Sequence, residues 1–106
     1  MSRIIHFHGT SALARRLRRQ RRAVLSAVAA HGGSNVRVFG SVATGDDHGD
    51  SDVDLLFTPS RPLGLLELGR LERDISGLIG SPVDLVPDSD LHPRMAERIL
   101  DEAIPL

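Results

Sequence analysis

The 106-residue chain contains no cysteine, lysine, tryptophan or tyrosine, and only three phenylalanines. Without cysteine it has no disulfide framework, no thiol nucleophile and no cysteine-ligated zinc or iron–sulfur site. Without lysine it can form neither a Walker-A phosphate site nor a Schiff-base catalyst. Three phenylalanines are too few for an aromatic platform on which nucleic acid bases stack. Backbone amides, hydroxyls, arginines, carboxylates and five histidines remain to carry the chemistry.

Long apolar runs are also absent, since none approaches the roughly 20 residues that span a bilayer. The N-terminus has Arg3 but no sustained apolar stretch or small-residue cleavage site, so we expect no signal peptide. The length fits one domain over residues 1–106, enough to bury one modest core. We therefore expect a cytoplasmic protein without membrane association.

The formal net charge of −1 conceals an uneven distribution. Residues 1–39 contain eight arginines and no acidic residue, whereas residues 40–106 contain five arginines and all 14 acidic residues. Six arginines lie between Arg15 and Arg22, a segment named here the arginine cluster. Such a cluster can attract nucleic acid or nucleotides, but on an amphipathic helix it is more commonly a solvated face. Nucleic acid binding therefore stays open without being favoured.

Alternating helix and strand patterns predict an α/β domain. Apolar residues at helical spacing, followed by a glycine pair, predict a basic amphipathic helix over residues 11–31. Its core-facing residues are expected to be Leu13, Leu17, Val24 and Val28. The segment 36–58 is expected to form a strand, a turn and a second strand. The other expected elements are a helix over 63–78, a strand over 82–86 and a helix over 90–103.

Two acidic residues lie on one side of the expected strand 52–58. Side chains of a strand alternate between its faces, so Asp52 and Asp54 should point to the same face and Val53, Leu55 and Phe57 to a core. Neighbouring carboxylates raise each other's pKa, and a divalent cation relieves this repulsion. Mg²⁺ usually binds one or two carboxylates together with substrate phosphates.

A third acidic residue, Asp84, lies within the otherwise apolar strand 82–86. Buried carboxylates are rare unless they are paired or bound to a metal. If this strand neighbours the strand that carries Asp54, Asp84 completes a cluster of three carboxylates. An ordinary polar loop before a strand would not explain why a third acid recurs in the next strand.

Gly40 and Ser41 follow the first strand and are expected to open a helical turn. Free backbone N–H groups at such a turn bind phosphate, and glycine lets the phosphate approach closely. The Ser41 hydroxyl can add a further donor. The turn and the carboxylates together suggest that the protein binds a nucleoside triphosphate, with its phosphates on the turn and a metal ion between the phosphates and the aspartates.

This combination resembles the DNA-polymerase-β-type nucleotidyltransferase superfamily. The segments "FGSVATGDDHGDSDVDLLF" and "RILDEAIPL" look like those of MNT-type minimal nucleotidyltransferases, the antitoxins that are paired with HEPN-domain toxins. The similarity covers residues 34–106. It implies a small mixed β-sheet flanked by helices.

The resemblance also implies a mechanism. Asp52 and Asp54 would hold two Mg²⁺ ions, while Asp84 would bind the catalytic ion and accept the proton of the acceptor hydroxyl. Gly40 and Ser41 would hold the β and γ phosphates of ATP. The acceptor would be a tyrosine hydroxyl of a HEPN ribonuclease toxin, which AMP transfer would silence.

One departure from the family pattern keeps alternatives open. Family members often carry arginine where this chain has Thr44, so phosphate binding could be weaker, or an arginine of the first helix could substitute. Two alternatives to AMP transfer onto a HEPN toxin stay open. The chain could be an antitoxin that neutralises its toxin by binding alone, or it could transfer the nucleotide to another acceptor. The chain length favours a macromolecular acceptor that completes the site. The tail Ile104–Leu106 could dock on such a partner or close the core.

Overall fold

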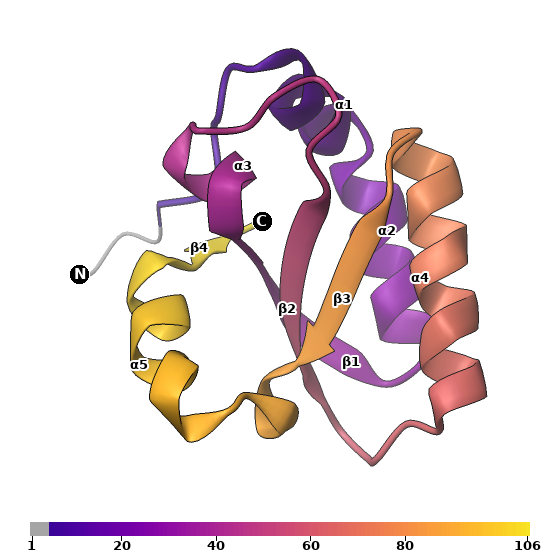
Figure 1. Cartoon of the computed structure of the whole chain (residues 1–106). Helices are drawn as coiled ribbons and strands as arrows, with labels where there is room; N and C mark the ends of the chain where they lie inside the picture. Colours follow the sequence, from indigo (N-terminus) through magenta and orange to yellow (C-terminus); the bar gives the residue numbers. More distant parts are fainter. Residues whose placement is uncertain (1–4) are drawn as a thin grey trace.

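The computed structural model describes residues 5–106, so residues 1–4 of the expected domain lie outside the described part. Four strands form one mixed sheet in the order β3-β2-β1-β4 (Figure 1). β1 runs antiparallel to β2 and to β4, and β2 runs parallel to β3. The predicted α/β class with a small mixed sheet is confirmed. The strands are β1 (Gly33–Phe39), β2 (Val53–Pro59), β3 (Val83–Pro87) and β4 (Ile104–Pro105).

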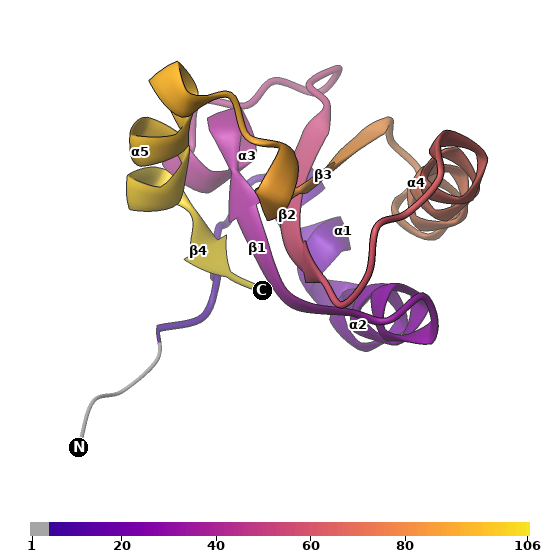
Figure 2. The same ribbon diagram turned by 90° about the horizontal axis from the view of Figure 1, so that it is seen from below.

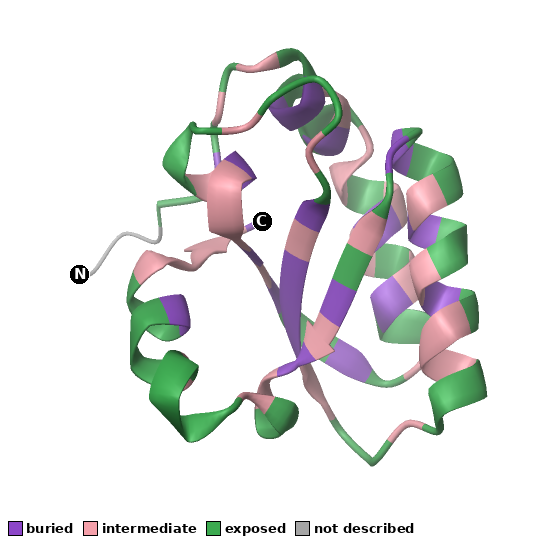
Figure 3. Ribbon diagram, viewed as in Figure 1, coloured by how far each residue is buried: buried purple, intermediate pink, exposed green. Residues whose placement is uncertain are grey.

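The helices α1, α2 and α4 cover one face of the sheet, and α5 lies on the other side, next to β4 (Figures 1 and 2). Val53, Leu55 and Phe57 of β2 point into the covered face and are fully buried, as predicted. Full burial of each such side chain stabilises the fold by roughly 1.5–3 kcal/mol. Buried residues accordingly follow β2 and the inner sides of α2 and α4 (Figure 3). The helices are α1 (Ala12–Arg19), α2 (Arg21–Ala30), α3 (Gly40–Thr44), α4 (Leu65–Ile79) and α5 (Pro93–Glu102).

The prediction of one continuous helix over residues 11–31 is wrong, because the helix is interrupted at Gln20. The Gln20 backbone has φ −95° and ψ 12°, and its N–H is shared between the carbonyls of Arg16 and Leu17 at 3.2 Å each. No glycine or proline marks this break in the sequence. The predicted apolar stripe is nevertheless confirmed, since all four of its residues are buried. The break lies between two helices that contact each other and α4, and of which α2 also packs on β1.

The remaining elements begin and end close to their predicted positions. The turn at Gly40 is helical, as expected, and forms α3. The last helix is shorter than predicted: α5 is preceded by a separate 3₁₀ turn, η1 (Asp88–Asp90). In α4 the apolar spacing of the sequence includes Leu65, which would lie on the core side, but Leu65 is 89% exposed, while Ile79 is buried. The apolar stripe of α4 therefore begins about one turn later than its leucines suggest.

The C-terminal tail closes the core, which was one of its two expected roles. Ile104 and Pro105 form β4, which pairs with Val38 and Arg37 of β1. The Leu106 side chain is 2% exposed, and its N–H donates to the Val36 carbonyl at 2.9 Å. No helix within residues 5–106 is long and apolar enough to cross a membrane.

Candidate active site

Two of the three predicted carboxylates lie side by side on the sheet. Register pairs Phe39 of β1 with Asp54 of β2, and Asp54 with Asp84 of β3, so all three form one row across the strands. Neighbouring strands are about 4.8 Å apart, and side chains of one row share a face. This face is opposite the one that α1, α2 and α4 cover. Asp84 is exposed on the edge strand, which corrects the expectation of an enclosed acid in an apolar strand.

Asp52 lies exposed in the loop that leads directly into β2. Two contacts tie this loop to the start of β3. The Val53 N–H donates to the Pro82 carbonyl at 2.9 Å, and the Ser81 hydroxyl donates to the Ser51 carbonyl at 3.3 Å. Asp52 is close enough to raise the pKa of Asp54, although it precedes the strand whose alternation was expected to orient it.

Burial and the neighbouring carboxylates together change the protonation of Asp54. Its pKa is raised from 3.8 to about 6, chiefly by burial and then by the charges of Asp84, Asp52 and Glu102. The charged form of Asp54 is therefore less favourable than that of an exposed aspartate, because the side chain is half-buried and negative charges surround it. A cation at this place would reverse the effect.

We expect this repulsion to appear as a pH-dependent loss of stability. Because the folded state raises the pKa of Asp54, it binds more protons than the unfolded state between about pH 4 and pH 6. The Asp54 contribution to the free energy of unfolding is therefore greatest below pH 4 and is lost as the pH rises through 6. Without Mg²⁺, Asp54→Asn should raise the melting temperature at pH 7.5, and this gain should shrink towards pH 4.5.

Thermal denaturation at both pH values, with and without Mg²⁺, measures this prediction. Mg²⁺ should stabilise the wild type at pH 7.5 and leave Asp54→Asn nearly unchanged. A melting-temperature difference between the two proteins that does not vary with pH would contradict the charge argument.

Gly40 brings the predicted phosphate-binding turn against Asp54. It has φ +73°, a left-handed conformation that suits glycine, and it is the first residue of α3. A Cβ atom at Gly40 would overlap with the Asp54 carboxylate oxygen Oδ2. The next residue, Ser41, is half-buried. The structure thus brings together Gly40, Ser41, Asp54 and Asp84, with Asp52 at the entrance to β2.

Glu102 is a further acidic residue at this site, which the sequence reasoning did not assign. Its Oε1 accepts the backbone N–H of Gly40 at 2.7 Å. Gly40 therefore contributes its shape and conformation, while its N–H is already engaged. The contact joins residues 62 positions apart, so no local motif could have revealed it. The quoted C-terminal segment contained Glu102, but nothing in its pattern indicated a site.

The carboxylates suit a cation that arrives with ligands of its own. Within residues 5–106, no group of three or more histidines, cysteines, aspartates or glutamates is arranged to hold a metal ion by itself. Mg²⁺ does not require such an arrangement, because it commonly takes one or two carboxylates and completes its shell with phosphates and water. The adjacent Asp54 and Asp84 and the raised pKa of Asp54 fit that mode of binding.

The Thr44 hydroxyl lies within hydrogen-bonding distance of the Asp46 carboxylate at 3.0 Å and of the Ser41 carbonyl at 3.3 Å. Where family members often carry arginine, this chain therefore has an uncharged side chain that contacts only nearby residues of the same turn. The contacts found for the first two helices lead elsewhere: Arg18 donates to the Gly9 carbonyl, and Arg21 donates to the Leu106 carbonyl. They do not support the expectation that an arginine of the first helix takes this place.

The arginine cluster is largely a solvated face. None of the ion pairs found in the described part of the chain includes a residue of the cluster. The exposed members are Arg15, Arg18, Arg19 and Arg22. Nucleic acid binding through this face stays a prediction.

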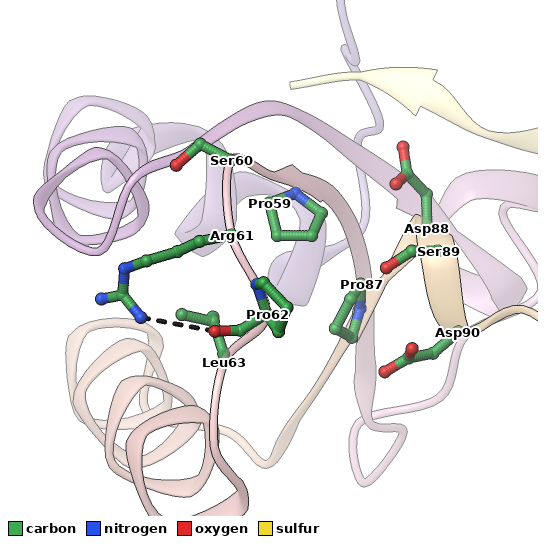
Figure 4. Close-up of a pocket in the computed structure, with 9 residues that line it drawn as sticks. All are labelled: Pro59, Ser60, Arg61, Pro62, Leu63, Pro87, Asp88, Ser89 and Asp90. Carbon is green, nitrogen blue, oxygen red and sulfur yellow. Dashed lines mark hydrogen bonds between the residues drawn. The ribbon is translucent and has the colours of Figure 1, made fainter.

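A pocket of about 390 Å³ lies at the opposite end of the sheet from the carboxylates (Figure 4). Asp54 and Asp84 are near the beginning of β2 and β3, whereas the pocket lies beyond the ends of these strands at Pro59 and Pro87. It is therefore not part of the candidate active site. The pocket is lined by Pro59, Ser60, Arg61, Pro62, Leu63, Pro87, Asp88, Ser89 and Asp90.

A glycine–serine turn beside paired aspartates on a mixed sheet defines a class of proteins that handle nucleotides. The chain belongs to the nucleotidyltransferase domain family, whose model matches residues 17–106, and it is a nucleotidyltransferase. A solved structure described provisionally as a minimal nucleotidyltransferase superposes with a TM-score of 0.78 at 46% identity. The superposition covers 93% of this chain and 100% of the solved chain. This match confirms the predicted resemblance to minimal nucleotidyltransferases.

Curated relatives agree with this family. A protein of Methanocaldococcus jannaschii, provisionally named a protein adenylyltransferase, is 31% identical over 84 residues, which are 79% of this chain and 90% of the relative. The protein adenylyltransferase MntA of Thermococcus cleftensis is 38% identical over 69 residues, which are 65% of this chain and 70% of MntA. A toxin–antitoxin structure with AMP-PNP shares the fold, with a TM-score of 0.71 at 17% identity over 79% of this chain and 69% of that chain.

Proposed function

We propose that this nucleotidyltransferase transfers AMP from ATP to a tyrosine hydroxyl of a HEPN ribonuclease toxin and thereby acts as its antitoxin. The observation that carries the proposal is the pair Asp54 and Asp84, in register on adjacent strands, beside the Gly40 turn. This arrangement places negative charge where a triphosphate with its counter-ion would lie.

The residues of the candidate site have different proposed roles, which agree with how far each is exposed. Half-buried Asp54 and exposed Asp52 and Asp84 would hold Mg²⁺, two ions in our proposal. When bound, these ions would neutralise the triphosphate and lower the pKa of an attacking hydroxyl. Ser41 would bind the β and γ phosphates through its hydroxyl and its backbone N–H. Asp84 is exposed on the edge strand, where an incoming acceptor could reach it.

The proposed reaction is a displacement at the α phosphorus. The acceptor oxygen forms a bond to that phosphorus, the bond to the β phosphate breaks, and pyrophosphate leaves. The acceptor proton passes to a carboxylate oxygen of Asp84. Such chemistry depends on positioning and charge neutralisation, which two aspartates on the sheet and a third in the preceding loop can supply.

The nature of the acceptor is supported by the relatives. Proteins similar to this chain are named protein adenylyltransferases, and a structure with the same fold is a toxin–antitoxin complex with AMP-PNP. The HEPN partner and its tyrosine follow from the resemblance in residues 34–106. The exposed face of Asp84 leaves room for a protein acceptor.

Label transfer tests the proposal directly. Incubation with α-labelled ATP, Mg²⁺ and a HEPN toxin, to be sought in the genes next to the one that encodes this chain, should place label on that toxin, whereas γ-labelled ATP should not. EDTA and replacement of the acceptor tyrosine by phenylalanine should each prevent labelling. Transfer of the γ label, or an unmodified partner by mass spectrometry, would reject adenylyl transfer. Neutralisation without any adduct would support the alternative of an antitoxin that acts by binding alone.

A further inference from the structure

Glu102 is the last residue of α5 and lies where that helix meets the candidate site. Its Oε1 accepts the Gly40 N–H at 2.7 Å, and its charge contributes to the raised pKa of Asp54. A hydrogen bond from a backbone N–H to a carboxylate is stronger than one between neutral groups. Glu102 is thus bound to the turn and close to the carboxylates at once.

The backbone fixes Glu102 at this place. Ile104 of β4 pairs with Val38 of β1, and Glu102 and Gly40 are each two residues away from that pair. The buried Leu106, whose N–H donates to the Val36 carbonyl, anchors β4 on its other side. The pairing of β4 with β1 therefore brings the end of α5, and with it the Glu102 carboxylate, beside Gly40.

Gly40 is held from both sides. On one side a Cβ atom would overlap with Asp54, so the backbone is in close contact with that carboxylate. On the other side the Gly40 N–H, which begins α3 and has no partner within the helix, is satisfied by Glu102. Removing the acceptor would free a left-handed residue to move away from Asp54, and α3 would move with it.

A role as a further metal ligand explains the geometry less well. One oxygen of Glu102 is committed to the Gly40 N–H, where α3 begins. We propose that Glu102 is a positioning residue, whose carboxylate holds the Gly40 turn against Asp54 and so sets the distance between phosphates and carboxylates. This inference rests on the proposed nucleotidyl transfer at the same site.

Three variants and one matched control test this role. Glu102→Ala removes the acceptor and should lower kcat for AMP transfer by about 10²-fold, the usual cost of a misplacement of about 1 Å, with little change in KM for ATP. Glu102→Gln keeps an acceptor oxygen and should restore most of kcat. Asp101→Ala removes an equal charge from the adjacent, exposed position and should behave like the wild type. Asp54→Asn reports separately on the proposed function.

The Gly40 amide in ¹H–¹⁵N spectra gives a readout that does not depend on activity. Its proton should resonate downfield in the wild type, stay downfield in Glu102→Gln and move upfield with faster exchange in Glu102→Ala. If Glu102→Ala keeps the wild-type kcat while Asp54→Asn is inactive, the inference fails and the proposed function stands. Equal loss of activity in Glu102→Gln and Glu102→Ala, with Gly40 unchanged, would also overturn the inference. A fully active Asp54→Asn would overturn the assignment of the site, and the proposed function itself fails if the wild type transfers no label.

Discussion

Replacing Asp54 by asparagine is expected to lower AMP transfer by about 10³-fold or more, the scale on which losing a charge-stabilising group raises a reaction barrier. Asparagine has the same size and keeps one carbonyl oxygen, so it preserves the packing against Gly40. It removes the negative charge that would hold a cation next to Asp84. Unfolding would not explain the loss, because Asp54→Asn should be more stable than the wild type at pH 7.5.

Initial rates of label transfer from α-labelled ATP to the HEPN partner measure this effect. The control is Asp74→Asn, which removes one exposed carboxylate from α4, outside the row of Phe39, Asp54 and Asp84. The control should transfer at the wild-type rate. The same two variants should be compared in cells that express the toxin. Protection by an inactive Asp54→Asn would mean that binding alone neutralises the toxin, and normal transfer by it would contradict our assignment of the site.

Gly40→Ala is expected to be the most damaging small substitution in the turn. The added methyl group would overlap with Asp54 Oδ2, and the left-handed backbone at φ +73° costs alanine about 1–2 kcal/mol. Either Asp54 or the turn must move. We expect transfer to fall by about 10²-fold, because a shift of about 1 Å between reacting groups has an effect of that size.

Gly45→Ala separates the two causes. Gly45 ends α3 with φ +84°, and nothing lies within 4 Å of the place where its Cβ would be. Both substitutions should lower the free energy of unfolding through backbone strain, measured by urea denaturation. Only Gly40→Ala should lose transfer activity at a temperature where both proteins are folded. Equal transfer rates would show that contact with Asp54 does not matter for catalysis.

Much of the site could be predicted because its signals are local. The spacing of Asp52 and Asp54, the turn at Gly40 and the apolar residues of β2 all act within a few residues. Periodicity likewise predicted the buried stripe of the first helices, since burial follows the repeat of the helix. Periodicity did not predict the break at Gln20, because no glycine or proline marks it and the apolar spacing continues through it.

The sequence by itself determined the α/β class, the residue types of the site and the chemistry excluded by missing lysine and cysteine. Only the tertiary structure decided that Asp84 lies exactly opposite Asp54, because register between strands depends on contacts across 30 residues of chain. It also decided that Glu102 occupies the Gly40 N–H, through a strand pair that brings the C-terminus beside β1. Local patterns determine which groups are available, and packing determines which of them meet.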